Sequence, residues 1–162
     1  MRRKFIGTLL GLSCLSLSTT ALADTASLAT STQKPPVQVA AFKIGNGQYS
    51  VNGYTFRDAA PYIKNDRTYL PLRFAAYAVG IGDNNIYWDG ANQKVYLQKN
   101  NKIIVVTIGS NTMQVGDQTI QMDVPAEIMD GRTMLPIAYI AKAFDCDVHW
   151  DGDKKIVTII AH

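Results

Sequence analysis

The residues of this sequence that could do chemistry occur in matched pairs. Arg67 opens the segment RTYLPL, and Arg132 opens the segment RTMLPI 65 residues later. A guanidinium presents two parallel N–H donors to a carboxylate, so either arginine could clamp an acidic ligand. The alternative role is structural, with each arginine paired to an acid of its own copy, and Asp89 or Asp151 is the expected partner. We favour the structural role.

Trp88 and Trp150 form the second matched pair, and each is followed by Asp-Gly. An exposed indole could stack on the flat face of a sugar, and Tyr87 would extend such a surface. Both tryptophans stand at equivalent positions next to a turn, however, and this favours anchoring in the core. Six tyrosines lie between residues 54 and 96, so any aromatic binding surface is expected in the first copy.

A possible metal site lies near the C-terminus, where Cys146 and His149 stand close to Asp147 and Asp151, and His162 could add a ligand. Structural metal sites usually need four protein ligands at characteristic spacing. In an extended strand, Cys146 and His149 would also point to opposite faces. We therefore expect no metal and no cofactor, and we interpret Cys146 as a buried structural thiol. A reactive thiol or an intermolecular disulfide is the alternative.

The N-terminus has the features of a secretory signal peptide. The positive segment Arg2-Arg3-Lys4 precedes an apolar stretch, and Ala21-Leu22-Ala23 supplies a small-x-small cleavage site. We therefore predict a secreted, extracellular or cell-wall-associated protein, cleaved after Ala23, with no transmembrane segment in the mature chain. The alternative is a lipoprotein lipidated at Cys14, but Gly11 stands where a large aliphatic residue is expected.

The charge balance changes with removal of the signal peptide. The whole chain has 16 Lys and Arg against 13 Asp and Glu, whereas the mature chain would have 13 of each. Proteins that bind nucleic acid need clustered lysines and arginines to neutralise phosphates. The sequence therefore argues against a nucleic-acid partner.

Three regions are expected along the chain. Residues 1–23 form the signal peptide. Residues 24–40, which read DTASLATSTQKPPVQVA, have no apolar periodicity and predict a flexible linker. Residues 41–162 form the folded domain, made of two repeats at about 48–100 and 112–160. The repeats share five landmarks in one order: Val51 and Val115, Pro61 and Pro125, Arg67 and Arg132, Pro71 and Pro136, and Trp88 and Trp150.

Each repeat joins short alternating strands to one helix. The pairs Asn52-Gly53, Asn65-Asp66 and Asp130-Gly131 predict tight turns. Pro71 and Pro136 predict the first turn of a helix. We therefore predict an α+β fold of two ββαββ-like repeats, each a short helix packed on a small antiparallel sheet. One such unit buries little apolar surface alone, so the two repeats should shield each other.

The order of these motifs resembles the copper amine oxidase N-terminal domain, or stalk domain, over roughly residues 47–160. The resembling segments are Val51-Asn52-Gly53, Asn65 to Phe74, Gly80, Tyr87 to Asp89, Lys94-Val95, Asp130 to Pro136, Val148 to Asp151 and Lys155-Ile156. The resemblance implies an accessory α+β domain. In amine oxidases, copper and the quinone cofactor belong to a separate domain with three His ligands, and this sequence has two His in all. The resemblance therefore implies no catalytic residues and no cofactor.

The motifs G-x-S-x-G, H-E-x-x-H and G-x-x-x-x-G-K do not occur in the sequence. We expect a secreted, non-enzymatic module that acts as a cell-envelope scaffold or binds an unknown protein or cell-wall polymer. One alternative is an accessory subunit or inhibitor of a hydrolase, which would use the loop GIGDNNIYW at residues 80–88. Another alternative is a copper or zinc carrier.

Overall fold

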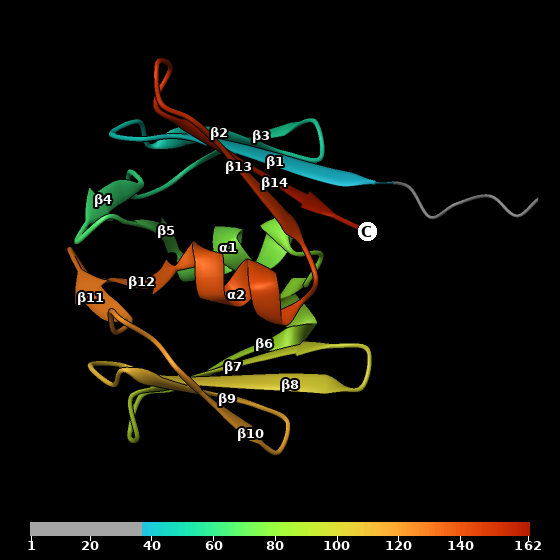
Figure 1. Cartoon of the computed structure of the whole chain (residues 1–162), viewed down its shortest axis with the longest axis vertical. Coiled ribbons are helices and arrows are strands. Elements are labelled where there is room, and N and C mark those ends of the chain that lie inside the picture. Colours follow the sequence, from blue (N-terminus) through green and yellow to red (C-terminus); the bar gives the residue numbers. More distant parts are fainter. Residues whose placement is uncertain (1–36) are drawn as a thin grey trace, which may run out of the picture. The chain divides into compact units, whose positions relative to one another are not determined.

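The computed structural model describes residues 37–162, which form a mixed α+β fold that is mostly β (Figure 1). The predicted signal peptide, Cys14 and residues 24–36 of the predicted linker lie outside the described residues. Within residues 37–162, none of the helices has the length and apolar character needed to cross a membrane.

The strands form three antiparallel sheets, named A, B and C. Sheet A contains, in spatial order, β13 (Asp147–Asp151), β14 (Ile156–Ala161), β1 (Gln38–Lys43), β2 (Gln48–Val51) and β3 (Tyr54–Arg57). Sheet B contains β11 (Glu127–Met129), β12 (Arg132–Pro136), β5 (Arg67–Pro71) and β4 (Tyr62–Lys64). Sheet C contains β10 (Gln118–Gln121), β9 (Thr112–Val115), β8 (Lys102–Thr107), β7 (Lys94–Lys99) and β6 (Ile86–Asp89).

Two short helices, α1 (Leu72–Ala78) and α2 (Ile137–Ala143), lie between sheets A and C, together with sheet B (Figure 1). Each helix begins directly after its proline, so Pro71 and Pro136 occupy the N-cap positions rather than the first turn, and neither makes a side-chain capping hydrogen bond. A one-turn 3-10 helix, η1 (Asp83–Asn85), leads into β6.

The ends of both helices use left-handed backbone. Gly80 has φ 82°, and Asp145 has φ 56° at the matching place after α2. At the end of each helix, one backbone carbonyl accepts a hydrogen bond from a lysine. Lys99 donates from Nζ to Val79 O over 2.9 Å, and Lys102 donates from Nζ to Ala143 O over 2.7 Å. A cation at this end of a helix also complements the helix dipole.

The predicted α+β class is confirmed, but two self-contained ββαββ units are not. Four strands precede each helix in its repeat, and two follow it. The strands of each repeat are divided among all three sheets, so that sheet A joins β2 and β3 of the first repeat to β13 and β14 of the second. Each outer sheet is therefore incomplete without strands from both halves of the chain.

The pairing of β5 with β12 joins the two repeats at the centre of the fold. The register places Leu70 opposite Leu135, and these are equivalent positions of the two RT-x-LP motifs. Tyr69 lies opposite Pro136, and Pro71 lies opposite Met134. The two strands are thus related by a local twofold axis between the leucines.

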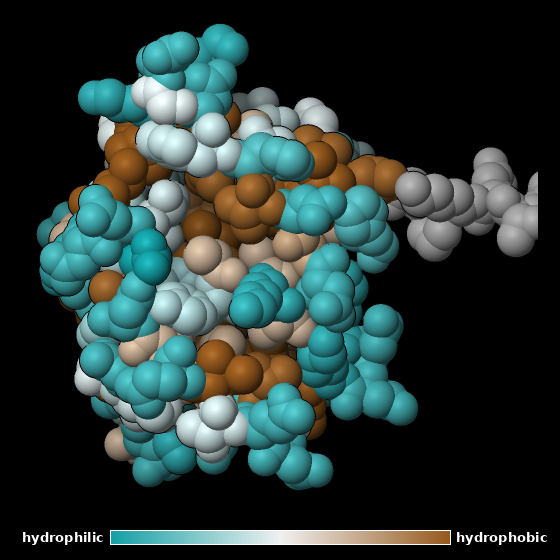
Figure 2. All heavy atoms as spheres, in the orientation of Figure 1, coloured by the Kyte–Doolittle hydropathy of each residue, from teal (hydrophilic) through white to brown (hydrophobic). Residues whose placement is uncertain are grey.

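One buried cluster connects both helices with all three sheets. Phe74 of α1 packs edge-on to Tyr49 of β2, with ring centroids 4.8 Å apart, and Phe74 also contacts Phe56 at 5.3 Å. On the other side, Leu97 and Ile104 of sheet C are fully buried in the same cluster. Burial of such side chains contributes about 1.5–3 kcal/mol each. Figure 2 shows hydrophilic residues at the ends of the hairpins on this face.

The folded part begins earlier than predicted. Strand β1 starts at Gln38, inside the predicted linker, and lies in the middle of sheet A between β14 and β2. Its residues alternate, because Ala40 and Phe42 are buried whereas Val39 is exposed. The register with β14 places Gln38 opposite Ala161, so the N-terminal end of β1 lies beside the C-terminal end of β14.

Candidate functional site

Both repeated arginines form ion pairs across the two repeats. Arg132, the first residue of β12, donates from Nε to Oδ1 of Asp58 over 2.6 Å. Arg67, the first residue of β5, donates from Nε to Oδ1 of Asp123 over 3.2 Å and from Nη2 to Oδ2. Each arginine therefore reaches an acid of the other repeat.

The predicted partners of the arginines are wrong. Asp89 accepts a hydrogen bond from the side chain of Asn92 over 2.7 Å, and Asp151 pairs with Lys154 over 2.9 Å. Each of these acids is thus used within its own turn. The expectation failed because it assumed that each repeat closes on itself, whereas the strands of the repeats interleave.

Sequence reasoning missed Asp58 and Asp123, although the repeat spacing contains a signal for them. The two acids are 65 residues apart, the same interval as the arginines, and each stands shortly before a landmark proline. The hydroxyl of Tyr139 and the guanidinium of Arg67 hold the pKa of Asp123 below its ordinary value. Three of the four side chains are at least 38% exposed, whereas Asp58 is 18% exposed. Partly exposed ion pairs of this kind contribute little to stability, so their main effect is to fix local geometry.

Gly47 determines the position of Asp58, the partner of Arg132. The backbone N–H of Asp58 donates to Gly47 O over 3.0 Å, and a Cβ at Gly47 would overlap the carbonyl oxygen of Asp58. We expect Gly47→Ala to lower the free energy of unfolding by about 1–3 kcal/mol, because backbone must move. Chemical denaturation measures the change.

Gly82→Ala is the matched control for Gly47→Ala. A Cβ at Gly82 meets nothing within 4 Å, and the backbone at Gly82 has φ −85°. Its free energy of unfolding should stay within about 0.5 kcal/mol of the unmodified chain. Equal stability of the two variants would show that the backbone at Asp58 can move without lowering the free energy of unfolding.

The expectation that the tryptophans anchor the core is wrong. Trp88 is 37% exposed and Trp150 is 48% exposed, and each lies on an edge strand, β6 of sheet C or β13 of sheet A. Trp88 pairs with buried Val95, so its side chain is on the inner face of the sheet but at the open edge. Its neighbour Tyr87 is 63% exposed.

The glycine of each Trp-Asp-Gly segment lies against its indole. A Cβ at Gly90 would come within 3.3 Å of Trp88 Nε1, and a Cβ at Gly152 within 3.5 Å of Trp150 Nε1. Each indole therefore rests with its nitrogen edge on a glycine backbone. This contact orients an exposed ring, and it is not the burial that the repeated positions led us to expect.

Trp88 and Arg132 line the same depression, which we call the Trp88 groove. Its volume is about 390 Å³, and it is lined by Asp58, Arg73, Ile86, Trp88, Arg132 and Thr133, with further contacts from Pro71, Leu72 and Gly131. A second depression of about 480 Å³ shares Asp58 and Arg132 with it and reaches Tyr62 and Met134. The groove thus brings together two predicted site residues from opposite repeats, whereas Arg67 and Trp150 lie outside both depressions.

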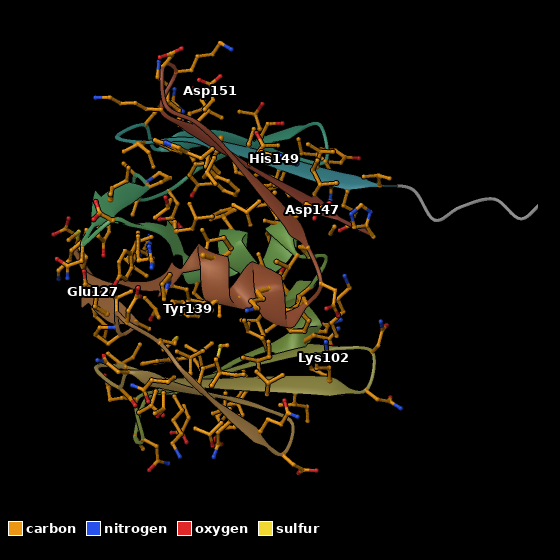
Figure 3. All side chains as sticks on the ribbon, in the orientation of Figure 1. Lys102, Glu127, Tyr139, Asp147, His149 and Asp151 are labelled. Carbon is orange, nitrogen blue, oxygen red and sulfur yellow. The ribbon has the colours of Figure 1, made fainter. Side chains whose placement is uncertain are left out.

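The acidic and histidine side chains near the C-terminus are spread along β13. Asp147, His149 and Asp151 follow one another along this edge strand (Figure 3). His162 Nε2 contacts Asp147 Oδ2 over 3.0 Å, and this contact lowers the pKa of Asp147. Among residues 37–162, no three or more His, Cys, Asp or Glu side chains are grouped so that they could hold a metal ion.

Cys146 is half-buried beside the main core rather than fully enclosed. Its Sγ lies 3.4 Å from Phe144 O, and burial raises the pKa of the thiol above its ordinary value. A raised pKa keeps the thiol protonated, which lowers its reactivity.

The loop at residues 80–88 is tied to the fold at both of its ends. Ile81 is buried at 2% exposure, and the Tyr77 hydroxyl donates to Asp83 Oδ1 over 2.6 Å. Only Asp83, Asn84 and Asn85 of η1 and the adjoining Gly82 form a fully exposed stretch before β6.

Comparison with known proteins agrees with the motif order described above. No curated protein matches the chain. Residues 46–159 match the family described as the copper amine oxidase N-terminal domain, and no amine oxidase catalytic domain is matched. The matched region includes both helices, the β5–β12 pair and the Trp88 groove. This chain belongs to the copper amine oxidase N-terminal domain family.

Proposed function

We propose that this chain is a secreted, non-catalytic module that binds a glycan polymer of the cell envelope. The signal-like segment at residues 1–23 supports secretion, and membership of an accessory-domain family supports a non-catalytic role. The observation that carries the binding role is the group of aromatic side chains on β6 and β7 of sheet C.

The aromatic group has rings on both faces of the β6–β7 hairpin. Tyr87 and Tyr96 lie opposite each other on the outer face, with ring centroids 5.7 Å apart. Trp88 lies on the inner face at the same edge. Tyr87 is 63% exposed beside the half-buried Tyr96, and exposed aromatic area of this kind marks interaction sites.

The outer face of sheet C suits a sugar chain because two aromatic side chains and two polar side chains lie on it in one row. Cross-strand pairing aligns Tyr87, Tyr96, Val105, Gln114 and Thr119 in one row over five strands. Rings pack against the apolar faces of sugars, while amides and hydroxyls bond to their hydroxyl groups. A row of this composition fits an extended polyhydroxylated polymer better than an apolar protein surface.

Sheet A provides an internal comparison. The matching row there contains His149, Thr158, Ala41, Ser50 and Thr55. These side chains occupy equivalent positions but include no Tyr, Phe or Trp. The aromatic surface is therefore a property of one outer sheet and does not follow from the folding pattern that both sheets share.

Co-sedimentation with purified peptidoglycan tests the proposal. The full chain should pellet with the polymer, and Tyr87→Ala should lower the bound fraction at least severalfold, because a stacking surface is removed. Tyr54→Ala is the matched control, since Tyr54 is 72% exposed but lies on β3 of sheet A. It should bind as the unmodified chain does. Absence of the chain from the pellet, or equal loss in both variants, would contradict the proposal.

A further inference from the structure

Arg132, which lines the Trp88 groove, has more unused N–H donors than Arg67 has. Arg67 uses Nε and Nη2 on Asp123 and Nη1 on the backbone oxygen of Asp66. Arg132 uses only Nε, on Asp58. Within residues 37–162, neither Nη group of Arg132 donates a hydrogen bond. Its side chain is 56% exposed, so these terminal groups are open to a ligand.

The charges that line the groove favour an anion. Two guanidinium groups, Arg73 and Arg132, face one carboxylate, Asp58, which leaves a net charge of +1. Arg73 is held only loosely by Asp83, at 3.5 Å, and both of these side chains are about two-thirds exposed. Such a pair is screened by solvent and leaves Arg73 able to turn toward a ligand.

Trp88 supplies a ring surface beside these cations. Its indole edge rests on Gly90, and its N–H donates to no other residue within the described part of the chain. A fixed aromatic face with an open donor, next to a guanidinium fork, offers both stacking and hydrogen bonding at one place. The two connected depressions each fall within the range of about 300–1,000 Å³ that is typical of ligand sites.

We propose that the Trp88 groove is a binding site for a carboxylate-bearing sugar of an acidic glycan. The Nη groups of Arg132 bind the carboxylate as a fork, and the ring of Trp88 stacks on the sugar. Arg73 adds long-range attraction. This inference rests on the proposed glycan-binding function and names the chemistry of the ligand and the residues that select it.

The site is present on one side of the fold only. At the place related to it by the repeat, each of the three nitrogens of Arg67 already donates to Asp123 or Asp66, and Ala138 stands where the first repeat has Arg73. Trp150 is exposed and lines neither depression. The two halves thus supply matched control positions for an experiment.

Isothermal titration calorimetry of the full chain with tetragalacturonate tests the assignment, with the methyl ester of the same oligosaccharide as the uncharged probe. The acid should bind at least about tenfold more tightly than the ester, since only the acid pairs with Arg132. Raising the salt concentration should weaken binding of the acid but not of the ester. This comparison needs no variant.

Two variants locate the site. Trp88→Ala should weaken tetragalacturonate binding about tenfold or more, and Arg132→Lys about fivefold, because lysine keeps the charge but loses the fork. Trp150→Ala and Arg67→Lys are the matched controls and should stay within about twofold of the unmodified chain. Thermal unfolding of each variant confirms that it is folded.

The outcomes separate this inference from the proposed function. Undetectable binding at millimolar tetragalacturonate, equal affinity for the ester, or unchanged affinity in Trp88→Ala and Arg132→Lys would each overturn the groove assignment. If the chain still pellets with peptidoglycan in that case, the proposed function stands without it. If tetragalacturonate binds as expected but peptidoglycan does not pellet the chain, the groove assignment stands and the proposed function is contradicted.

Discussion

A chain that begins at residue 46, where the family match begins, is expected to lose cooperative folding, whereas residues 37–162 should fold. The shorter chain lacks β1, which pairs with β14 over six residues and with β2 on its other side. Its removal would leave a gap in the middle of sheet A, with unpaired backbone groups on both sides.

The energetic effect of losing β1 is large relative to the stability of a domain. Ala40 and Phe42 are buried in the main cluster, and Phe42 also packs on Tyr49 with ring centroids 5.0 Å apart. Truncation of a buried Phe to Ala alone costs about 3–5 kcal/mol. Domains of this size are stable by about 5–15 kcal/mol in total, and the lost ladder hydrogen bonds add to the loss.

Urea denaturation followed by circular dichroism compares the two chains. Residues 37–162 should give one sigmoidal transition, and residues 46–162 should give none, or should aggregate. A cooperative transition of similar midpoint in the shorter chain would show that β14 and β2 close directly on each other.

Leu70→Ala and Leu135→Ala are each expected to lower the free energy of unfolding by about 2–5 kcal/mol. Both leucines are fully buried, and they lie opposite each other at the centre of the β5–β12 pair. Each replacement leaves a cavity between the two halves of the molecule. Because the two side chains face one another, the double variant should deviate from the sum of the single variants by at least about 0.5 kcal/mol.

Exposed isoleucines of the same sheet provide controls for the leucine variants. Ile63 on β4 is 46% exposed, and Ile128 on β11 is 49% exposed. Ile63→Ala and Ile128→Ala should change the free energy of unfolding by no more than about 0.5 kcal/mol, because little burial is lost. Chemical denaturation measures the free energy of unfolding of the two single leucine variants, their double variant and the two isoleucine variants. A leucine variant as stable as the isoleucine controls would contradict a shared core at the twofold axis.

Local features of the fold were predictable where local sequence determines them. Asn52-Gly53 and Asp130-Gly131 adopt the positive φ angles that their turn chemistry favours, with φ 51° and 81° in the first pair and 49° and 72° in the second. Gly80, which follows α1, is also in the left-handed region that glycine favours. The conformation at such positions depends on the preferences of a few neighbouring residues, so the local sequence is sufficient to predict it.

The arrangement of the strands was not predictable from the same local signals. Period-two patterns show that a strand exists but not which strand pairs with it, so Arg67 was assigned an acid of its own repeat instead of Asp123. Strand β1 was missed because its apolar residues follow a Ser- and Thr-rich segment with two prolines. The repeat interval offered a signal, since Gln38 stands 64 residues before Lys102, the first residue of β8.

The candidate site was also not predictable from local sequence, because it depends on how the strands are arranged. Trp88 and Trp150 were expected in the core because both occupy equivalent positions, but equivalence does not distinguish a central strand from an edge strand. Trp88 and Arg132 come from different repeats and meet only because β12 returns past the start of α1. Their proximity could therefore be predicted only from the topology.

The side-by-side ends of β1 and β14 have a mechanical consequence. Gln38 lies opposite Ala161 in an antiparallel pair, so tension applied between the two ends would peel the strands apart from that end. Hydrogen bonds loaded in sequence yield at low force, whereas bonds loaded together in shear resist. We therefore expect this module to unfold at low force when it is pulled between Gln38 and Ala161.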